Sequence, residues 1–350
     1  MVENWPTMCS NTRSLENSNI YLLVTMKNRY RLLILAACLK ASLLGSAAAQ
    51  DGFSFSYDTI SFFEKPTAFE IGIGTLNTNL LIDQSIIYRD STAHHSAATQ
   101  FLGLFNFGTQ LANGWQFNTQ YLANYVGFDD DDYRGNLALS IADYWGVIAI
   151  GQVTGSVFEQ TRRQRGTGNA NLAFDQFVGG LEDEGIFYSV RFNSYEIAAT
   201  VDKEGGFELG ANFERPIGAS SYFGALRVRK GEAITSGEIQ DTLGGAAVIA
   251  YTYASLTVDT QLGIERVNSI DSDEIEHLFS SLGLSYKTGP LTVSAEAGLA
   301  KLDGQKRYSA AFGSRWDLAR GLSLNLGVNY QNTENSVEET IVRGSLRYEF

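Results

Sequence analysis

The chain contains three histidines, and these are the first residues to consider for catalysis or metal binding. His94 and His95 are adjacent, and adjacent side chains on an extended chain point to opposite sides, so we do not expect them to share a metal ion. His277 lies near Asp271 and Asp273 and is the one candidate for the histidine of a hydrolytic site. A histidine at the edge of a solvated loop is the simpler interpretation. We therefore predict no catalytic residue and no enzyme.

Four successive carboxylates could bind a hard cation. Oxygen ligands are those that Ca²⁺ prefers, so a structural calcium site is one hypothesis for this run, and no other cofactor is expected. A solvated loop tip is the alternative, because charge runs are commonly exposed. The residues are Asp129, Asp130, Asp131 and Asp132.

Alternation of apolar and polar residues dominates the chain from residue 71 onward. In the segment 115–126, Trp115, Phe117 and Tyr121 fall on one face, whereas Asn118 and Gln120 fall on the other. A period of two indicates β-strands. We predict about sixteen strands. The expected turns lie at 111–114, 143–144, 193–194, 215–218, 254, 287–290 and 319–321, a loop at 89–96 carries His94 and His95, and the longest interruption spans 153–184.

The connections are expected to alternate between short turns and longer polar loops, and aromatic residues gather at the strand ends. This pattern is typical of an all-β, antiparallel transmembrane barrel, because a sheet in lipid must close on itself to satisfy its backbone. No apolar run is long enough for a spanning helix. A soluble β-sandwich is the alternative, since it could use the same alternation to pack a core.

The last strand carries a second signal. Val342, Gly344, Leu346, Tyr348 and the terminal Phe350 fall on one face, and charged or polar residues fall on the other. This resembles the C-terminal assembly signal of Gram-negative outer-membrane barrels, which ends in Phe after alternating apolar residues. The resemblance assigns Gly344, Leu346, Tyr348 and Phe350 to that signal.

The N-terminal region has the features of an export signal. Residues 27–31 are basic, residues 32–39 are apolar, and residues 47–49 offer an A-x-A cleavage site. We predict a non-native upstream start at 1–25, a signal peptide at 26–49, a lead-in at 50–70 and the barrel at 71–350. Residues 51–66 could instead add an N-terminal strand. Alternatively, Cys38 could be the lipidated cysteine of a lipoprotein signal.

The chain is acidic, with a formal net charge of −13. Residues 1–49 contain five Lys/Arg and two acidic residues, so the remainder carries −16. This excess argues against nucleic acid as a partner. Cys9 and Cys38 are the only cysteines, so the exported chain would have no disulfide.

The segment order resembles that of general porins of the Gram-negative outer membrane, which are sixteen-stranded and trimeric. The residues that carry the resemblance are Trp145–Gln152, the long loop, Gly185–Phe192 and Leu346–Phe350. The resemblance implies a water-filled channel for passive diffusion of small hydrophilic solutes and ions. It also implies outer-membrane lipid and two further copies of the chain as partners.

In general porins the third and longest loop folds into the barrel and narrows the pore, and 153–184 holds that place here. Charges on such a loop and on the opposite wall would set the ion preference. The expected constriction residues are Arg162, Arg163, Arg165, Asp175, Glu182, Asp183 and Glu184. The arginines expected on the lumen wall by parity are Arg134, Arg191, Arg227, Arg229, Arg307, Arg315, Arg343 and Arg347.

Two other functions remain open at this point. A substrate-specific outer-membrane channel would line its path with aromatic residues, whereas the aromatic residues here alternate outward. A barrel enzyme would need a histidine paired with Asp, Ser or Asn at one rim. Neither the preferred solute nor the sign of the ion selectivity follows from the sequence.

Overall fold

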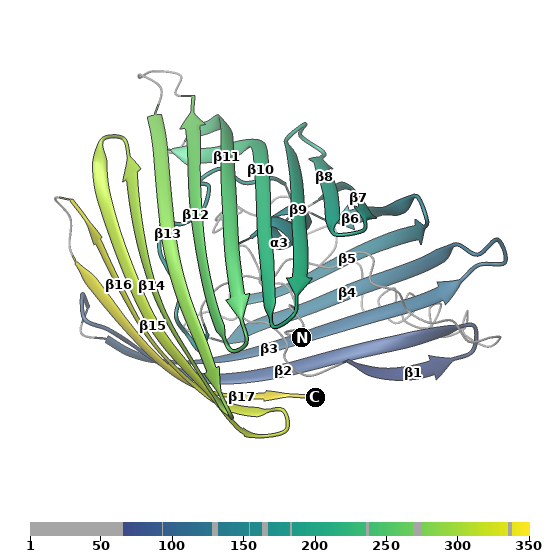
Figure 1. Ribbon diagram of the computed structural model, residues 1–350, viewed down its shortest axis with the longest axis horizontal. Helices are drawn as coiled ribbons and strands as arrows, with labels where there is room; N and C mark the ends of the chain where they lie inside the picture. The colour runs from purple at the N-terminus through teal and green to yellow at the C-terminus, as the bar shows by residue number, and fades with distance from the viewer. Residues whose placement is uncertain are drawn as a thin grey trace.

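The computed structural model describes residues 66–350, with gaps at 93, 128–131, 154, 163–166, 183, 236–237, 269–274 and 335–337. Within this part, seventeen strands form one antiparallel sheet that curves into a barrel (Figure 1). The strands are β1 (Thr67–Ile71), β2 (Gly74–Arg89), β3 (His94–Gln110), β4 (Gln116–Gly127), β5 (Asp132–Asp143), β6 (Gly146–Gln152), β7 (Glu184–Phe192), β8 (Tyr195–Asp202), β9 (Phe207–Ile217), β10 (Ser220–Thr235), β11 (Glu238–Tyr253), β12 (Leu256–Val267), β13 (Ile275–Thr288), β14 (Leu291–Leu302), β15 (Gln305–Ala319), β16 (Leu322–Thr333) and β17 (Glu339–Glu349).

The barrel closes where the last strand meets β2. The register runs from Ile341 opposite Arg89 to Glu349 opposite Leu81, and the terminal Phe350 exchanges two backbone hydrogen bonds of 2.9 Å with Leu80. Strands β2 to β17 therefore form a closed ring of sixteen, as predicted. The closing strand pairs its backbone on both sides, to β16 and to β2, so the ring has no open edge there.

The short strand β1 lies outside this ring. It forms a hairpin with the start of β2, from Thr67 opposite Thr78 to Ile71 opposite Gly74. Of the predicted lead-in 50–70, the described end thus contributes a strand. The upstream stretch 1–25, the signal peptide 26–49, Cys38 and residues 50–65 lie outside the described residues, and their assignments stay predictions.

The two faces of the barrel differ in polarity in the way the alternation predicted. On β16, Leu326 and Val328 are exposed on the outside, whereas Ser323 and Asn325 are buried on the inside. The same division holds on β17, where Leu346 and Tyr348 are exposed and Ser345 and Arg347 are buried. Apolar side chains exposed over the whole outer surface would be unfavourable in water, and they match a hydrocarbon surrounding.

Aromatic pairs mark the end of the barrel where the chain terminates. Ring contacts there join residues of neighbouring strands, of one strand, or of the connections before β4 and β6, with centroids 5.0 to 6.3 Å apart. Aromatic rings at one level suit a membrane–water interface, because Tyr and Trp combine an apolar ring with a polar O–H or N–H group. The pairs are Trp115–Trp145, Tyr195–Phe213, Tyr222–Tyr251 and Tyr348–Phe350.

Several connections differ from the sequence prediction. Strands β8 and β9, and also β14 and β15, are joined by tight turns at the end where longer loops were expected, with Asp303 and Gly304 at φ of 50° and 76°. The predicted loop at 89–96 is shorter, because His94 and His95 already belong to β3. Cross-strand pairing to Arg89 and Tyr88 extends β3 over these two residues, which alternation alone did not reveal.

Polar contacts join the β2–β3 turn to the start of β17, at the end of the barrel where His94 and His95 begin β3. Asp90 accepts the backbone N–H of Thr340 at 2.6 Å, and this hydrogen bond lowers the pKa of the Asp90 carboxyl. The contact is thus present above the ordinary carboxyl pKa and is lost as the pH falls through the lowered pKa.

Of the helices in the described part of the chain, none is long and apolar enough to cross a membrane.

The outward and inward faces can be distinguished by a matched pair of substitutions on β5. Leu137 is exposed on the outside, and its neighbour Asn136 is half-buried on the inside. We expect Leu137→Lys to lower the free energy of unfolding in lipid vesicles by roughly 2–4 kcal/mol, as for a lysine near the bilayer midplane. Asn136→Lys should have a much smaller effect. Equal losses for the two variants, measured by guanidinium titration, would contradict the assignment of the faces.

Candidate functional site

The segment between β6 and β7 turns into the barrel, and we call residues 153–183 the inward loop. Its first part forms the helix α3 (Ser156–Thr161), which packs against β8, β9 and β10 and lies behind β9 and β10 in Figure 1. Val157 and Phe158 are buried in this contact, and Asn212 of β9 donates a hydrogen bond of 2.8 Å to the carbonyl of Gln160. The sequence prediction that this loop folds inward therefore agrees with the geometry.

Beyond the helix, the loop reaches the wall formed by β14 to β16. The backbone N–H of Thr167 donates to Ser294 Oγ at 2.8 Å. The N–H of Asn171 donates to Asn329 Oδ1 at 2.7 Å, and Ser309 Oγ donates to the carbonyl of Ala173 at 2.8 Å. Side chains of three successive strands thus satisfy the backbone of a loop that has no ladder of its own.

The loop then returns along the wall toward β7. Glu265 of β12 accepts the N–H groups of Val178 and Gly179 at 2.6 and 2.9 Å. Gly180 and Glu232 of β10 exchange two backbone hydrogen bonds, and a Cβ at the adjacent Gly231 would overlap the Gly180 carbonyl. The inward loop therefore lies against the wall from β8 to β17 along most of its described length.

The eight arginines expected on the wall all share the inward face of their strands, but most are ion-paired. On β15, Arg315 pairs with Asp317 at 2.6 Å, and Arg307 lies over the ring of Phe174, 4.9 Å from its centroid. Near the short-turn end, the exposed Arg191 pairs with Glu196 at 2.9 Å. Arg134 is exposed at the loop-bearing end of β5.

Two of these arginines lie beneath the inward loop. Arg227 and Arg229 flank the fully buried Glu208, with shortest N–O distances of 3.5 and 3.0 Å. The Arg227 guanidinium also lies 4.5 Å from the ring centroid of Phe158 and 4.6 Å from that of Phe177, both on the loop. A guanidinium between two rings and a carboxylate is held by ion pairing and cation–π contacts. These side chains anchor the loop.

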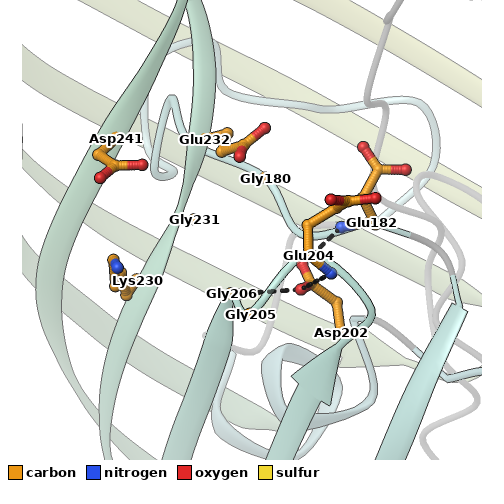
Figure 2. Close-up of a pocket in the computed structure, with 10 residues that line it drawn as sticks. All are labelled: Gly180, Glu182, Asp202, Glu204, Gly205, Gly206, Lys230, Gly231, Glu232 and Asp241. Atoms are coloured by element: carbon orange, nitrogen blue, oxygen red, sulfur yellow. Dashed lines mark hydrogen bonds between the residues drawn. The ribbon is translucent and has the colours of Figure 1, made fainter.

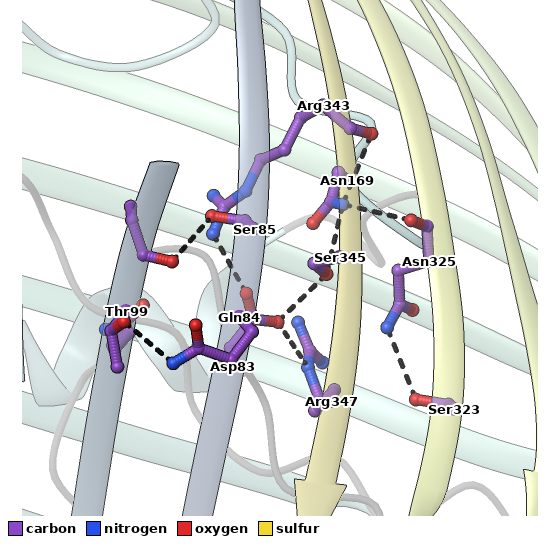
Figure 3. A network of polar contacts seen from close by, with 12 residues as sticks. Asp83, Gln84, Ser85, Thr99, Asn169, Ser323, Asn325, Arg343, Ser345 and Arg347 are labelled. Atoms are coloured by element: carbon purple, nitrogen blue, oxygen red, sulfur yellow. Dashed lines mark hydrogen bonds and ion pairs between the residues drawn. The ribbon is translucent and has the colours of Figure 1, made fainter. Parts of the chain in front are cut away.

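The remaining pair of wall arginines lies at the closing seam. Arg343 and Arg347 of β17 contact the two oxygens of Asp83 at 3.3 and 3.2 Å, and Asp83 is fully buried (Figure 3). Ser345, between them on the same face, donates to Asp83 at 3.0 Å. One carboxylate of β2 thus joins three side chains of β17 inside the barrel.

The predicted constriction residues occupy different surroundings. Arg162 pairs with Glu159 at 2.6 Å at the end of α3, and Asp175 is buried on the returning part of the loop. Glu184 begins β7 and pairs with Lys203 at 3.7 Å. Arg163, Arg165 and Asp183 lie outside the described residues, as do Asp129, Asp130 and Asp131 and the side chain of Asp132 of the predicted calcium site.

A polar hollow lies where the inward loop approaches the β8–β9 turn (Figure 2). Asp202 fills its base and accepts the N–H groups of Glu182, Glu204 and Gly206 at 2.7 to 3.0 Å. In the part of the chain that the structure describes, no group of three or more His, Cys, Asp or Glu residues is arranged to bind a metal. The charged residues around the hollow are Glu182, Asp202, Glu204, Lys230, Glu232 and Asp241.

The expectation for His277 was wrong. It is not solvated at a loop edge but buried on β13, with its ring 5.1 Å from that of Phe279 and Nδ1 3.5 Å from Glu265 Oε2. The same Glu265 carboxylate holds two amides of the inward loop, so the pair lies beneath that loop. Asp271 and Asp273 are outside the described residues.

Sequence reasoning missed the acids that hold the loop and the seam, namely Asp83, Glu208 and Glu265. Each occupies an inward-facing position of its strand, so alternation along the strand could have predicted that its side chain lies inside the barrel. Their roles depend on partners between 12 and 264 residues away, such as His277 for Glu265 and Arg347 for Asp83. No spacing along the chain indicates such pairs.

Comparison with known proteins supports the fold. The chain matches no protein-family model and no curated protein. Among solved structures it is similar to an anion-selective porin from Comamonas acidovorans, with TM-score 0.65, 12% identity, and 79% of this chain and 100% of that one covered. It is also similar to the trimer form of OmpT, an outer-membrane protein of Vibrio cholerae (TM-score 0.62, 10% identity, 79% and 99% covered). A mutant of Rh. blastica porin gives TM-score 0.57 at 14% identity, with 79% and 100% covered.

These similarities show the fold class of the chain. The chain has the closed sixteen-stranded barrel of bacterial porins, with a long loop between the fifth and sixth strands of the ring lying inside it. The fold that the sequence resemblance implied is confirmed.

Glu208 offers a test of the buried ion pairs. Glu208→Gln would leave Arg227 and Arg229 buried without their counter-charge, so we expect a loss of roughly 3–5 kcal/mol in the free energy of unfolding. Glu196→Gln is the matched control, because its partner Arg191 is exposed and such a pair contributes only about 0–1 kcal/mol. Guanidinium titration of both variants in vesicles measures the difference. Similar losses would show that Glu208 does not carry a buried network.

Proposed function

We propose that the chain forms a water-filled channel in the outer membrane of a Gram-negative bacterium, through which small hydrophilic solutes and ions diffuse passively. The observation that carries this proposal is the closed sixteen-stranded ring with an apolar outer face and an inward loop held to its wall. A ring of this size is wider than its own side chains can fill, so water occupies the lumen. The similarity to solved porins supports the same function.

The charges inside the barrel favour a weakly selective channel. At least six of the eight wall arginines pair with acids, which weakens the fixed field that these arginines would otherwise create. A solved structure of OpdK from Pseudomonas aeruginosa with vanillate has TM-score 0.51 to this chain, so a substrate-specific channel is the second candidate. In the described part of the loop, Phe158 and Phe177 are buried against arginines, which argues against an aromatic path for a solute.

The assembly and export of the channel belong to the same proposal. Three copies of the chain would associate in the membrane, and the trimer form of OmpT supports this stoichiometry. The segment 26–49 would direct export and be removed. A non-enzymatic role is supported by the position of His277, whose ring lies beneath the inward loop and not at an open rim.

Electrical recording tests the proposal. The purified protein, inserted into a planar lipid bilayer, should produce stepwise conductance. A water-filled pore with compensated charges should conduct in proportion to bulk salt from ~0.1 M to ~1 M, although the Debye length falls from about 10 Å to about 3 Å. The reversal potential under a salt gradient should be small.

The controls separate the alternatives. Heat-denatured protein in the same detergent should give no steps. Conductance that saturates with one solute, or current blocked by that solute, would support a substrate-specific channel. An absence of steps from correctly folded, heat-modifiable protein would contradict channel function altogether.

A further inference from the structure

We propose that Asn169 is a positioning residue that latches the tip of the inward loop, residues 167–171, to the seam where the barrel closes. The latch would fix the position of the loop tip in the lumen, and its acceptors lie on β16 and β17, the last two strands of the ring. Its effect on ion flow rests on the proposed channel function, but its existence does not.

The Asn169 side chain points into a ring of acceptors from two strands (Figure 3). Its Nδ2 lies 3.3 Å from Ser345 Oγ and 3.5 Å from the carbonyl oxygens of Asn325 and Arg343. An amide has two N–H groups, so it shares them among three acceptors. This arrangement places one loop side chain across β16 and β17 together.

The backbone of the tip is held at the same place by Asn329. The Asn329 side chain donates to the carbonyl of Asn169 at 3.1 Å and accepts the N–H of Asn171 at 2.7 Å. An asparagine that donates to one backbone group and accepts from another fixes both position and direction of the segment. The tip is therefore held from both sides of Asn169.

Two glycines of the wall make room for this contact. Gly313 of β15 and Gly327 of β16 are directly opposite each other in the sheet and face inward. A Cβ at Gly313 would overlap the carbonyl oxygen of Thr167, and a Cβ at Gly327 would overlap the backbone of Asn169. The loop can approach this closely only because neither residue has a side chain.

One acceptor of the latch is also held across the closed seam. Ser345, which faces Asn169, also donates to Asp83 of β2 at 3.0 Å, and Asp83 holds Arg343 and Arg347 on either side. Asp83 and Ser345 are 262 residues apart in sequence, so they meet only when the first and last strands of the ring pair. The tip therefore docks beside the closed seam, on a serine that is itself held from the other side of that seam.

A disulfide tests the position of the tip. In a chain whose Cys9 and Cys38 are replaced by Ser, no cysteine remains, and Asn169→Cys with Ser345→Cys adds one close pair. We expect mild oxidation of the folded protein to join this pair much faster than a pair on distant walls, measured by thiol titration and gel mobility. Asn169→Cys with Asn124→Cys, an inward residue of β4, is the matched control and should remain reduced. Failure of the first pair to join, or equal joining of the control, would overturn the latch.

Current recording of the same variant tests positioning. With the disulfide reduced, the latch is missing, and we expect open-channel current noise several-fold above that of the unmodified chain; oxidation should restore the quiet current. Asn169→Ala should reproduce the noisy state with an unchanged denaturation midpoint. Asn332→Ala, on β16 but bonded to Tyr330 and Glu338 instead of the loop, should stay quiet.

Gly327→Ala provides an independent readout. Its Cβ should displace the tip from the wall into the lumen and lower the conductance, with the barrel still closed. A disulfide that forms while noise and conductance stay unchanged in every variant would overturn the positioning role. If no variant and no unmodified protein conducts, the channel function fails instead, and the disulfide result still decides the latch.

Discussion

The pairing of β17 with β2 is the interaction on which the rest of the structure depends. In hydrocarbon no water can satisfy an open strand edge, so a spanning sheet must close on itself. Here the closure extends to the last residue, where Phe350 and Leu80 exchange two backbone hydrogen bonds. Inside the barrel the buried Asp83 adds side-chain contacts to the same seam. In the closed ring, the apolar face of each strand lies outside and the polar face lies inside.

The wall of the ring also provides the surface against which the inward loop lies. The loop has little regular structure of its own, and its backbone groups are satisfied by side chains of the wall, from Ser294 on β14 to Glu265 on β12. Glycines such as Gly327 allow the two backbones to approach. The inward loop is thus packed against the wall, and the lumen is the space inside the barrel that the loop does not fill.

The same packing holds many of the charges inside the barrel in ion pairs and hydrogen bonds. Buried charges are stable when they are paired and hydrogen-bonded, and Glu208, Glu265 and Asp83 each meet several donors. Residues that seemed candidates for a field or for catalysis in the sequence, such as Arg227 and His277, are covered by the loop. What remains is a lumen lined by polar and charged side chains of the wall and of the loop.

The sequence by itself determined the strands, the number in the ring and the two faces, because side-chain direction in a strand repeats every two residues. The alternation of Leu326 and Val328 with Asn325 and Asn329 already separates outside from inside. Alternation could not show which side chains pair inside the barrel. These partners come from different strands or from the inward loop, and they lie up to 264 residues apart in the chain. Only the tertiary structure brought Asp83 to Arg347 and Asn169 to Ser345, buried His277 beneath the loop, and extended β3 over His94 and His95.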